Sequence, residues 1–179
     1  MKFEETPLQG AYVVSLNRIE DNRGFFARGF CSDEFRRHGL SAEMVQLNVG
    51  FSHTKGTVRG MHYQESPHAE AKFVRCTRGA IFDVVVDLRA GSPTQGQWFG
   101  LELSAENGLM LYAPQGFAHG YQTLADDTDM YYMASTAYAA SAARGLRFDD
   151  AALGIQWPLA PTVVSDADRR WPDYLAVTQ

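Results

Sequence analysis

The histidines of two short segments are the side chains of this chain best suited to chemistry near neutral pH. His62 lies in the run Gly56–Gln64, and His119 lies near the end of the run Ala113–Gly120. An imidazole with an ordinary pKa of about 6.5 gains and loses a proton near neutral pH, and it also binds metals. Lys72 follows His62 in the sequence and adds an ammonium group. These residue types indicate either a metal site or an acid–base site.

The two segments resemble the paired sequence blocks of a cupin barrel, H-x-(H/Q) on one strand and P-x-G-x-x-H on a later one. A metal-binding cupin has a second histidine in the first block and a carboxylate further on. Here Gln64 and Lys72 occupy those positions. A protonated lysine does not ligate a divalent cation and repels it. The sequence therefore predicts a pocket without a metal or cofactor, suited to moving a proton next to a carbonyl group.

Composition limits the class of protein. The 179 residues fit a single domain spanning 1–179 and suffice for a hydrophobic core. A hydrophobic fraction of 45% and a charged fraction of 21% are those of an ordinary globular protein. A net charge of -5 and a pI near 5.5 argue against nucleic acid or a membrane surface as a partner. A small anionic ligand stays compatible with this charge, because local basic residues decide its binding.

Two further features favour the cytoplasm. Cys31 and Cys76 are too few to form a disulfide framework, as expected in a reducing compartment. The segment Met1–Pro7 lacks the apolar region of a signal peptide, and no stretch approaches the ~18 apolar residues of a spanning helix.

Short β-branched and aromatic runs, separated by Gly, Asn, Asp or Ser, dominate the first 136 residues. The predicted strands are Tyr12–Leu16, Met44–Phe51, Thr57–Tyr63, Lys72–Arg78, Ile81–Leu88, Trp98–Leu103, Leu109–Tyr112 and Met130–Thr136. Many short strands at regular intervals predict an all-β fold, a double-stranded β-helix jelly roll (cupin barrel) with a few short helices.

One helix is expected at Ser32–His38, with Ser32 as the N-cap and Gly39 just beyond the end. The stretch after Tyr138 is irregular. Trp157 and Trp171, each followed by proline, are expected to anchor a C-terminal wrap.

The two-residue period of a strand predicts which side chains share a face. One face of each strand would line the barrel interior and collect four polar residues. They are His62, Lys72, His119 and Tyr132. Asp83 and Asp87 face away from the apolar residues of their own strand. Arg59 falls opposite His62, unless a bulge at Gly60 resets the alternation.

Each of these residues also has a purely structural interpretation. A histidine in a strand is commonly a hydrogen-bonded core residue, a lysine at a strand start is commonly solvated, and Tyr132 alone reads as a core aromatic. His119 lies in an apolar Pro/Gly turn that it would cap. Asp168 lies in the charged run Ser165–Arg170 and reads as solvated. The position of His62 upstream of Lys72 favours function over structure.

Most of the chain resembles the dTDP-4-dehydrorhamnose 3,5-epimerase family. The matching segments are Asp21–Phe26, Lys55–Gln64, Lys72–Cys76, Gly79–Trp98, Leu103–Asn107, Pro114–Gly120, Ile155–Pro158 and Ser165–Asp168. The resemblance implies a cofactor-independent isomerase with a jelly-roll fold, acting as a homodimer. It also implies a substrate, a nucleotide diphosphate linked to a 4-keto-6-deoxyhexose, whose C3 and C5 are inverted by enolisation.

The same resemblance implies roles for individual residues. His62 would be the general base, Asp168 would orient it, Tyr132 would be the general acid, and Lys72 would stabilise the enolate at O4. A further set would bind the nucleotide diphosphate sugar, with the last member stacking near the base: Arg23, Gln46, Asn48, Arg59, Lys72, His119 and Tyr138.

Several positions depart from the family pattern. Arg28 replaces an acidic residue, Ala143 ends an alanine-rich turn where Pro and Glu are usual, and Ala167 replaces a lysine before Asp168. Met133 replaces a lysine beside Tyr132, and strand parity points it away from the tyrosine's face. These changes fall mainly on the nucleotide side, which leaves the nucleotide carrier open.

Alternatives therefore remain at this stage. An epimerase of the same fold could invert C3 only, or act on another nucleotide carrier. A non-catalytic sugar-binding cupin would need His62 and Tyr132 to be structural. A metal-dependent cupin oxygenase is disfavoured by Gln64 and Lys72. The pathway, the end product and the dimer geometry do not follow from the sequence.

Overall fold

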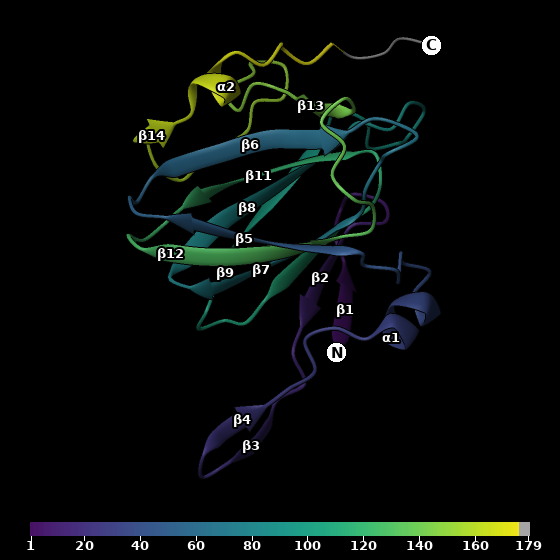
Figure 1. The fold of residues 1–179 in the computed structure, drawn as a ribbon, viewed down its shortest axis with the longest axis vertical. Helices are drawn as coiled ribbons and strands as arrows, with labels where there is room; N and C mark the ends of the chain where they lie inside the picture. Colours follow the sequence, from purple (N-terminus) through teal and green to yellow (C-terminus); the bar gives the residue numbers. More distant parts are fainter. Residues whose placement is uncertain (176–179) are drawn as a thin grey trace.

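The computed structural model describes residues 1–175, and within them two antiparallel sheets face each other (Figure 1). The first sheet has the strand order β1 (Lys2–Glu5), β2 (Tyr12–Ser15), β10 (Met110–Ala113), β7 (Lys72–Arg78), β12 (Thr128–Ala134), β5 (Gln46–Ser52). The second has the order β13 (Ala143–Gly145), β6 (Thr57–Gln64), β11 (Phe117–Thr123), β8 (Ala80–Asp87), β9 (Trp98–Ser104), with β14 (Val163–Val164) pairing with β6. The predicted all-β jelly roll is confirmed.

The main core lies between the two sheets. Val74 and Met130 from the first sheet pack with Ile81, Val85 and Phe117 from the second, and all are buried. Because side chains alternate along each strand, the neighbours of these residues point outward. The outer faces are then covered by other parts of the chain.

Helix α1 (Ser32–Arg37) covers the outer face of the first sheet. Its buried Phe35 meets Phe73 edge to face, with ring centroids 4.9 Å apart. The helix was predicted, but its N-cap was not. Cys31 occupies the cap position and makes no side-chain cap hydrogen bond, while Ser32 is the first helical residue. The acidic first turn and basic last turn favour the helix dipole without a side-chain cap.

The C-terminal segment covers the outer face of the second sheet, as expected for a wrap. Trp157 packs against the buried apolar side chains on this face and donates its Nε1 hydrogen to the carbonyl of Phe148 at 2.8 Å. A second short helix, α2 (Asp166–Arg169), follows β14. Ser165 caps it by accepting a hydrogen bond from the Asp168 amide at 3.0 Å. This helix was not predicted, because its run of charges read as a solvated loop.

Some strands were missed as well. The strand face expected for His119 is present, because Phe117–Thr123 forms β11 in the centre of the second sheet, and the alternative interpretation of His119 as the cap of a Pro/Gly turn is wrong. Pro114 and Gly116 precede the strand. Gly120 lies within it, where Met61 and the backbone of β6 pack closely against it. Strands β1, β13 and β14 have two to four residues, too short for an alternation to show.

Strands β3 (Ile19–Asp21) and β4 (Gly24–Phe26) form a hairpin of their own. In Figure 1 it extends away from the two sheets, beyond helix α1. Its apolar side chains are exposed: Ile19, Phe25 and Phe26.

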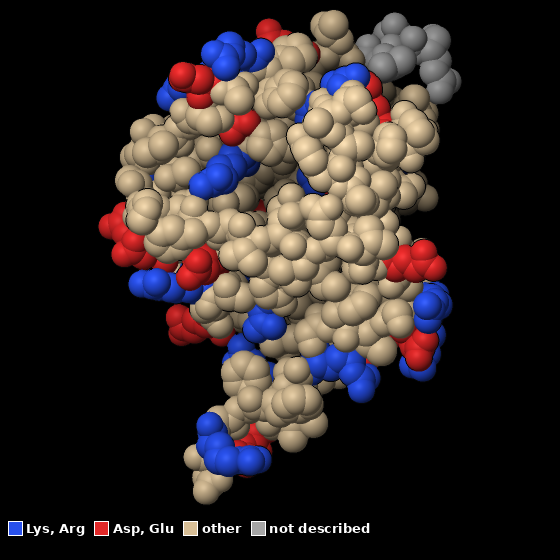
Figure 2. All heavy atoms as spheres, in the orientation of Figure 1, with Lys and Arg blue, Asp and Glu red and all other residues tan. Residues whose placement is uncertain are grey.

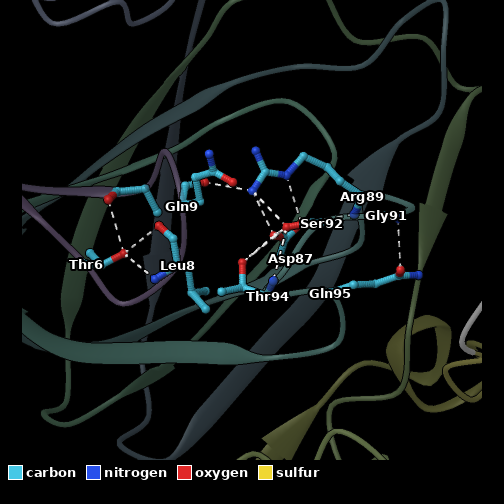
Figure 3. Close-up of polar contacts among 10 residues, drawn as sticks. Thr6, Leu8, Gln9, Asp87, Arg89, Gly91, Ser92, Thr94 and Gln95 are labelled. Atoms are coloured by element: carbon cyan, nitrogen blue, oxygen red, sulfur yellow. Dashed lines mark hydrogen bonds and ion pairs between the residues drawn. The ribbon is translucent and has the colours of Figure 1, made fainter.

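A buried carboxylate joins the N-terminal strands to the end of β8 (Figure 3). Asp87 is fully buried and accepts hydrogen bonds from Ser92 Oγ at 2.5 Å and Thr94 Oγ1 at 2.7 Å. Arg89 donates to the same carboxylate and reaches the Gln9 carbonyl at 2.7 Å. Burial raises the pKa of Asp87, but the hydrogen bonds outweigh it and lower that pKa to about 2.

This carboxylate makes stability depend on acid pH. The pKa of Asp87 is about 2 in the folded chain and about 3.9 in an unfolded one, so its contribution is present above pH ~4 and is lost as the pH falls towards 2. Asp87→Asn should lower the free energy of unfolding at pH 7 by on the order of 2 kcal/mol. Urea unfolding between pH 2.5 and 7 measures this. An unchanged slope of stability against pH in the variant would contradict the assignment.

Candidate active site

A cavity of about 400 Å³ opens between β6 of one sheet and β5 and β12 of the other. Figure 2 shows the hollow on this face, with basic side chains at its rim. Seven of the residues predicted for the site line it: Asn48, Arg59, His62, Lys72, His119, Tyr132 and Tyr138. The four residues that strand parity was expected to collect, His62, Lys72, His119 and Tyr132, are among them.

His62 and Asp168 form a hydrogen-bonded pair at this cavity. His62 Nε2 lies 2.6 Å from Asp168 Oδ1, and the His62 side chain keeps 44% of its surface exposed while Asp168 is nearly buried. Burial raises the pKa of Asp168, but the bonds from His62, the Gly60 amide and Ser165 bring it below its ordinary value. An ionised Asp168 accepts the Nε2 hydrogen, which leaves Nδ1 of His62 with a free lone pair. That nitrogen can accept a proton.

A register shift brings Arg59 to the cavity as well. His62 pairs with His119, but Arg59 pairs with Tyr121, so β6 has one residue more than β11 over this stretch. The bulge that was considered at Gly60 is therefore present. Gly60 has a φ of +130°, and a Cβ there would lie 2.6 Å from the Gly120 Cα. A glycine is needed at this position, and its bulge resets the alternation of side chains.

Tyr132 stands on the wall opposite His62. It belongs to β12 of the first sheet, whereas His62 belongs to β6 of the second, and both side chains line the same cavity. Burial is the largest influence on the Tyr132 hydroxyl, and the negative charge of Glu70 adds to it; both raise the pKa of Tyr132. The hydroxyl therefore stays protonated at neutral pH and can donate a proton.

His119 is held by a carboxylate that the sequence interpretation did not assign to the site. Its Nε2 lies 2.8 Å from Asp83 Oδ1, and Asp83 is fully buried. Parity did predict that Asp83 turns away from the apolar face of β8. An aspartate in an otherwise apolar strand was the available signal, since a buried carboxylate needs a partner.

Lys72 is also buried, not solvated at its strand start. Its Nζ lies 3.2 Å from Glu70 Oε1 and donates to the His62 carbonyl oxygen at 3.1 Å. Burial lowers the pKa of Lys72, and the negative charges of Glu70 and Asp83 act against that. Glu70 was missed because it precedes β7, where strand parity no longer applies.

Gln46, Asn48 and Tyr138 form a connected edge of the cavity. Gln46 donates to Asn48 Oδ1 at 2.9 Å and accepts from the Tyr138 amide at 3.0 Å. Asn48 and Tyr138 line the cavity, while Gln46 supports both from behind. The exposed Tyr138 ring is free to contact a ligand.

Arg23 does not lie with the other predicted residues. It sits at the turn of the β3–β4 hairpin with 85% of its side chain exposed, and it pairs with Asp21. The expectation that it joins the cavity is wrong for the cavity of its own chain. A hairpin that leaves the sheets carries its turn away from them (Figure 1).

Trp171 lines the cavity beside the His62–Asp168 pair. Its Nε1 donates to Asp168 Oδ1 at 3.3 Å, and its ring centroid lies 6.4 Å from that of His62. It was predicted only as a packing anchor. The packing is tight, because a Cβ on Gly145 would lie 2.4 Å from the indole ring.

Among residues 1–175, no three His, Cys, Asp or Glu side chains are grouped so that they could hold a metal ion. In the same part of the chain, no helix has the length and apolarity to cross a bilayer.

Comparison with known proteins decides the family. Residues 5–175 match the family described as dTDP-4-dehydrorhamnose 3,5-epimerase. The chain belongs to this family. The enzyme of that name from Sinorhizobium fredii is 44% identical over 173 residues, 96% of this chain and 89% of the relative.

Two further relatives are similar to this chain over most of its length. The crystal structure of a dTDP-4-dehydrorhamnose 3,5-epimerase from Bacillus anthracis, with TDP and PPi bound, has a TM-score of 0.93 and 39% identity, and the match covers 97% of this chain and 99% of that one. A dTDP-4-dehydrorhamnose 3-epimerase from Streptomyces niveus is 34% identical over 170 residues, 94% of this chain and 82% of the relative.

The positions that depart from the family pattern are mostly outside the cavity. Arg28 pairs with Glu34 at 2.9 Å beside helix α1, and Ala167 is exposed on α2. Met133 packs against the cluster under α1, away from Tyr132, as parity predicted. Ala143 alone among these four lines the cavity in the described part of the chain.

The tight contact at Gly145 predicts a local effect. Gly145→Ala should displace Trp171 and lower the free energy of unfolding by about 1–3 kcal/mol, because the added methyl group overlaps the indole ring. Thermal unfolding followed by tryptophan fluorescence measures both effects. Gly29→Ala is the matched control, since a Cβ there meets nothing closer than 3.6 Å. Equal melting temperatures for the two variants would show that the Trp171 contact is loose.

Proposed function

We propose that this chain is an isomerase that inverts C3 and C5 of a nucleotide-linked 4-keto-6-deoxyhexose, converting dTDP-4-dehydro-6-deoxyglucose to dTDP-4-dehydrorhamnose. The observation that supports it most is the placement of His62 and Tyr132 on opposite walls of one cavity. Family membership supplies the sugar and the carrier.

The chemistry follows from the ketone at C4, which acidifies the C–H bonds at C3 and C5. His62 Nδ1 takes the proton from carbon, and the bonding electrons move to form the enolate with its charge on O4. The Lys72 ammonium stabilises that oxygen as charge develops. Tyr132 then returns a proton to the opposite face of the carbon, and solvent restores both side chains. Positioned acids and bases of this kind each contribute roughly 10²–10⁴ in rate.

Arg59, His119, Asn48 and Tyr138 bind the nucleotide diphosphate sugar in this proposal. Arg59 is anchored by its hydrogen bond to the Phe51 carbonyl at 2.9 Å, and it keeps a charged face at the cavity mouth for a phosphate. A thymidine carrier is the one that the family indicates.

A C3-only epimerase is the second candidate, supported by the similarity to the Streptomyces niveus enzyme. Both candidates use the same base and acid. They differ in whether C5 reaches the position from which His62 can remove its proton.

Solvent exchange separates these functions. In D₂O, the protein should catalyse incorporation of deuterium at C3 and C5 of dTDP-4-keto-6-deoxyglucose. Proton NMR measures this as loss of the C3 and C5 proton signals. Exchange at C3 alone would support the second candidate. No exchange with any nucleotide carrier would support a sugar-binding protein without catalysis.

Two variants test the roles of the proton-transfer groups. His62→Ala should abolish exchange, because it removes the proposed base Nδ1, while circular dichroism stays unchanged. Tyr132→Phe should lower net inversion by roughly 10²–10⁴ but retain some exchange, since the base still removes the proton. If His62→Ala kept near-normal turnover, the base would be another residue.

The proposed assembly is a homodimer, in which a second copy covers strand β5. This strand is the edge of its sheet, and its outward side chains are apolar and exposed, with Val49 at 73%. An unpaired apolar edge strand favours pairing with another chain. The apolar hairpin β3–β4 projects from the sheets and would pack on the partner, bringing Arg23 near the partner's cavity, which Val49 and Gly50 border.

Light scattering on a sizing column tests the dimer. Val49→Glu should give a monomer, because a charge replaces apolar surface at the edge strand. Val163→Glu is the control, as that valine is exposed on β14 outside this surface. Arg23→Ala should stay dimeric and raise KM. A monomeric wild type would refute the dimer, and an unchanged KM for Arg23→Ala would refute the placement of Arg23 near the partner's cavity.

The cytoplasm is the proposed location. The two cysteines support it, because both are free thiols, as expected in a reducing compartment.

A further inference from the structure

Glu70 is a nearly buried carboxylate inside the cavity, with 10% of its side chain exposed. Its Oε1 lies 3.2 Å from Lys72 Nζ, and its Oε2 accepts a hydrogen bond from Gln64 Nε2 at 3.2 Å. Gln64 is itself fixed, because its Oε1 accepts from the Ala139 amide at 2.6 Å. The carboxylate is therefore held from one side and directed at the ammonium group on the other.

Lys72 needs such a partner to keep its charge. Its side chain is buried, and burial lowers the pKa of a lysine. Besides Glu70, the titratable groups that face Lys72 are His62 on β6, Asp83 on β8, His119 on β11 and Tyr132 on β12. The neighbouring strand β10 places Ala113 opposite Lys72 and contributes no titratable group there. Asp83 is already paired with His119, and the Tyr132 ring centroid lies 5.7 Å from Nζ.

We propose that Glu70 is a positioning residue that keeps Lys72 protonated and aims one of its N–H bonds at the ketone oxygen of the substrate. This inference rests on the proposed function. An ammonium group has three N–H bonds, and Glu70 and the His62 carbonyl oxygen take two of them. The third is left for a ligand. Since the His62 carbonyl belongs to the residue that supplies the base, the cation is fixed relative to that base.

The charge of Glu70 also suits the timing of the reaction. A neutral lysine would donate a weaker hydrogen bond and would not offset the enolate charge. With Glu70 ionised, the cation is present before the proton leaves carbon, so no proton has to be gained by Lys72 during the step. Glu70 acts through Lys72 and needs no contact with the substrate.

Titration of Lys72 in the free protein tests the electrostatic part without any activity. Proton–carbon NMR at the lysine Cε, assigned with Lys72→Arg, follows ionisation against pH. Glu70→Gln should move the Lys72 midpoint to lower pH, whereas Glu70→Asp, which keeps the charge, should move it less. Glu102→Gln is the control, since Glu102 is exposed on the outer strand β9. An unchanged midpoint in Glu70→Gln overturns the proposal.

The pH profile of kcat/KM tests the catalytic part. Relative to its own value at pH 6.5, Glu70→Gln should lose roughly tenfold more activity than the wild type by pH 9, because Lys72 loses its proton earlier. Arginine stays charged, so Glu70→Gln added to Lys72→Arg should leave the profile of Lys72→Arg unchanged. An identical alkaline limb in wild type and Glu70→Gln refutes the role.

The two experiments fail separately. If the wild type does not act on the sugar, the proposed function falls, and the NMR titration still decides whether Glu70 controls Lys72. If Glu70→Gln does not fold, Glu70→Asp tests the positioning role instead, because it keeps the charge but moves the carboxylate away from Lys72. Its shorter side chain should lower kcat with little change in KM, and an unchanged kcat would overturn the positioning role.

Discussion

The pairing of each ionisable side chain in the cavity with a partner of opposite kind is the constraint on which the site depends. Ionised groups are costly to bury unless each has a partner. His62 meets Asp168, His119 meets Asp83, and Lys72 meets Glu70. The His62–Asp168 and His119–Asp83 pairs each join two different elements of the fold, so these contacts also hold the walls of the cavity in place. The two imidazoles and the lysine ammonium group are consequently oriented before any ligand enters.

The two sheets contribute different parts of the chemistry. The second sheet supplies His62 and His119 as register partners on β6 and β11, and the first supplies Lys72 and Tyr132 on β7 and β12. The cavity is therefore lined by an imidazole from one sheet and a phenol from the other. The proposed inversion at carbon needs a proton acceptor and a proton donor on opposite sides of the sugar, which this arrangement would supply.

Strand alternation predicted much of this site from the sequence. Four residues at the same phase of their strands, His62, Lys72, His119 and Tyr132, do share the cavity. Asp83 was visible as a charged residue in an apolar strand. Parity fails where a strand is irregular or absent. Regular alternation places Arg59 opposite His62, and only the bulge at Gly60 brings its side chain to the cavity.

Other parts were beyond a reading of local pattern. Asp168 and Trp171 reach His62 from the distant C-terminal segment, and only the family resemblance pointed to the aspartate. Glu70 lies before its strand, where no period applies. Arg23 was placed with the site by resemblance, yet its hairpin extends away from the sheets. The short strands and the second helix were too brief for propensity to register.

The partner of His62 lies 106 residues away along the chain, on a short helix outside both sheets. Short terminal helices generally open at a lower free energy than the central strands of a fold. Opening of this helix would break the hydrogen bond that fixes the His62 tautomer, whereas the ladders of the two sheets do not depend on it. The orientation of the imidazole is thus set by a contact that can be lost without melting of the sheets.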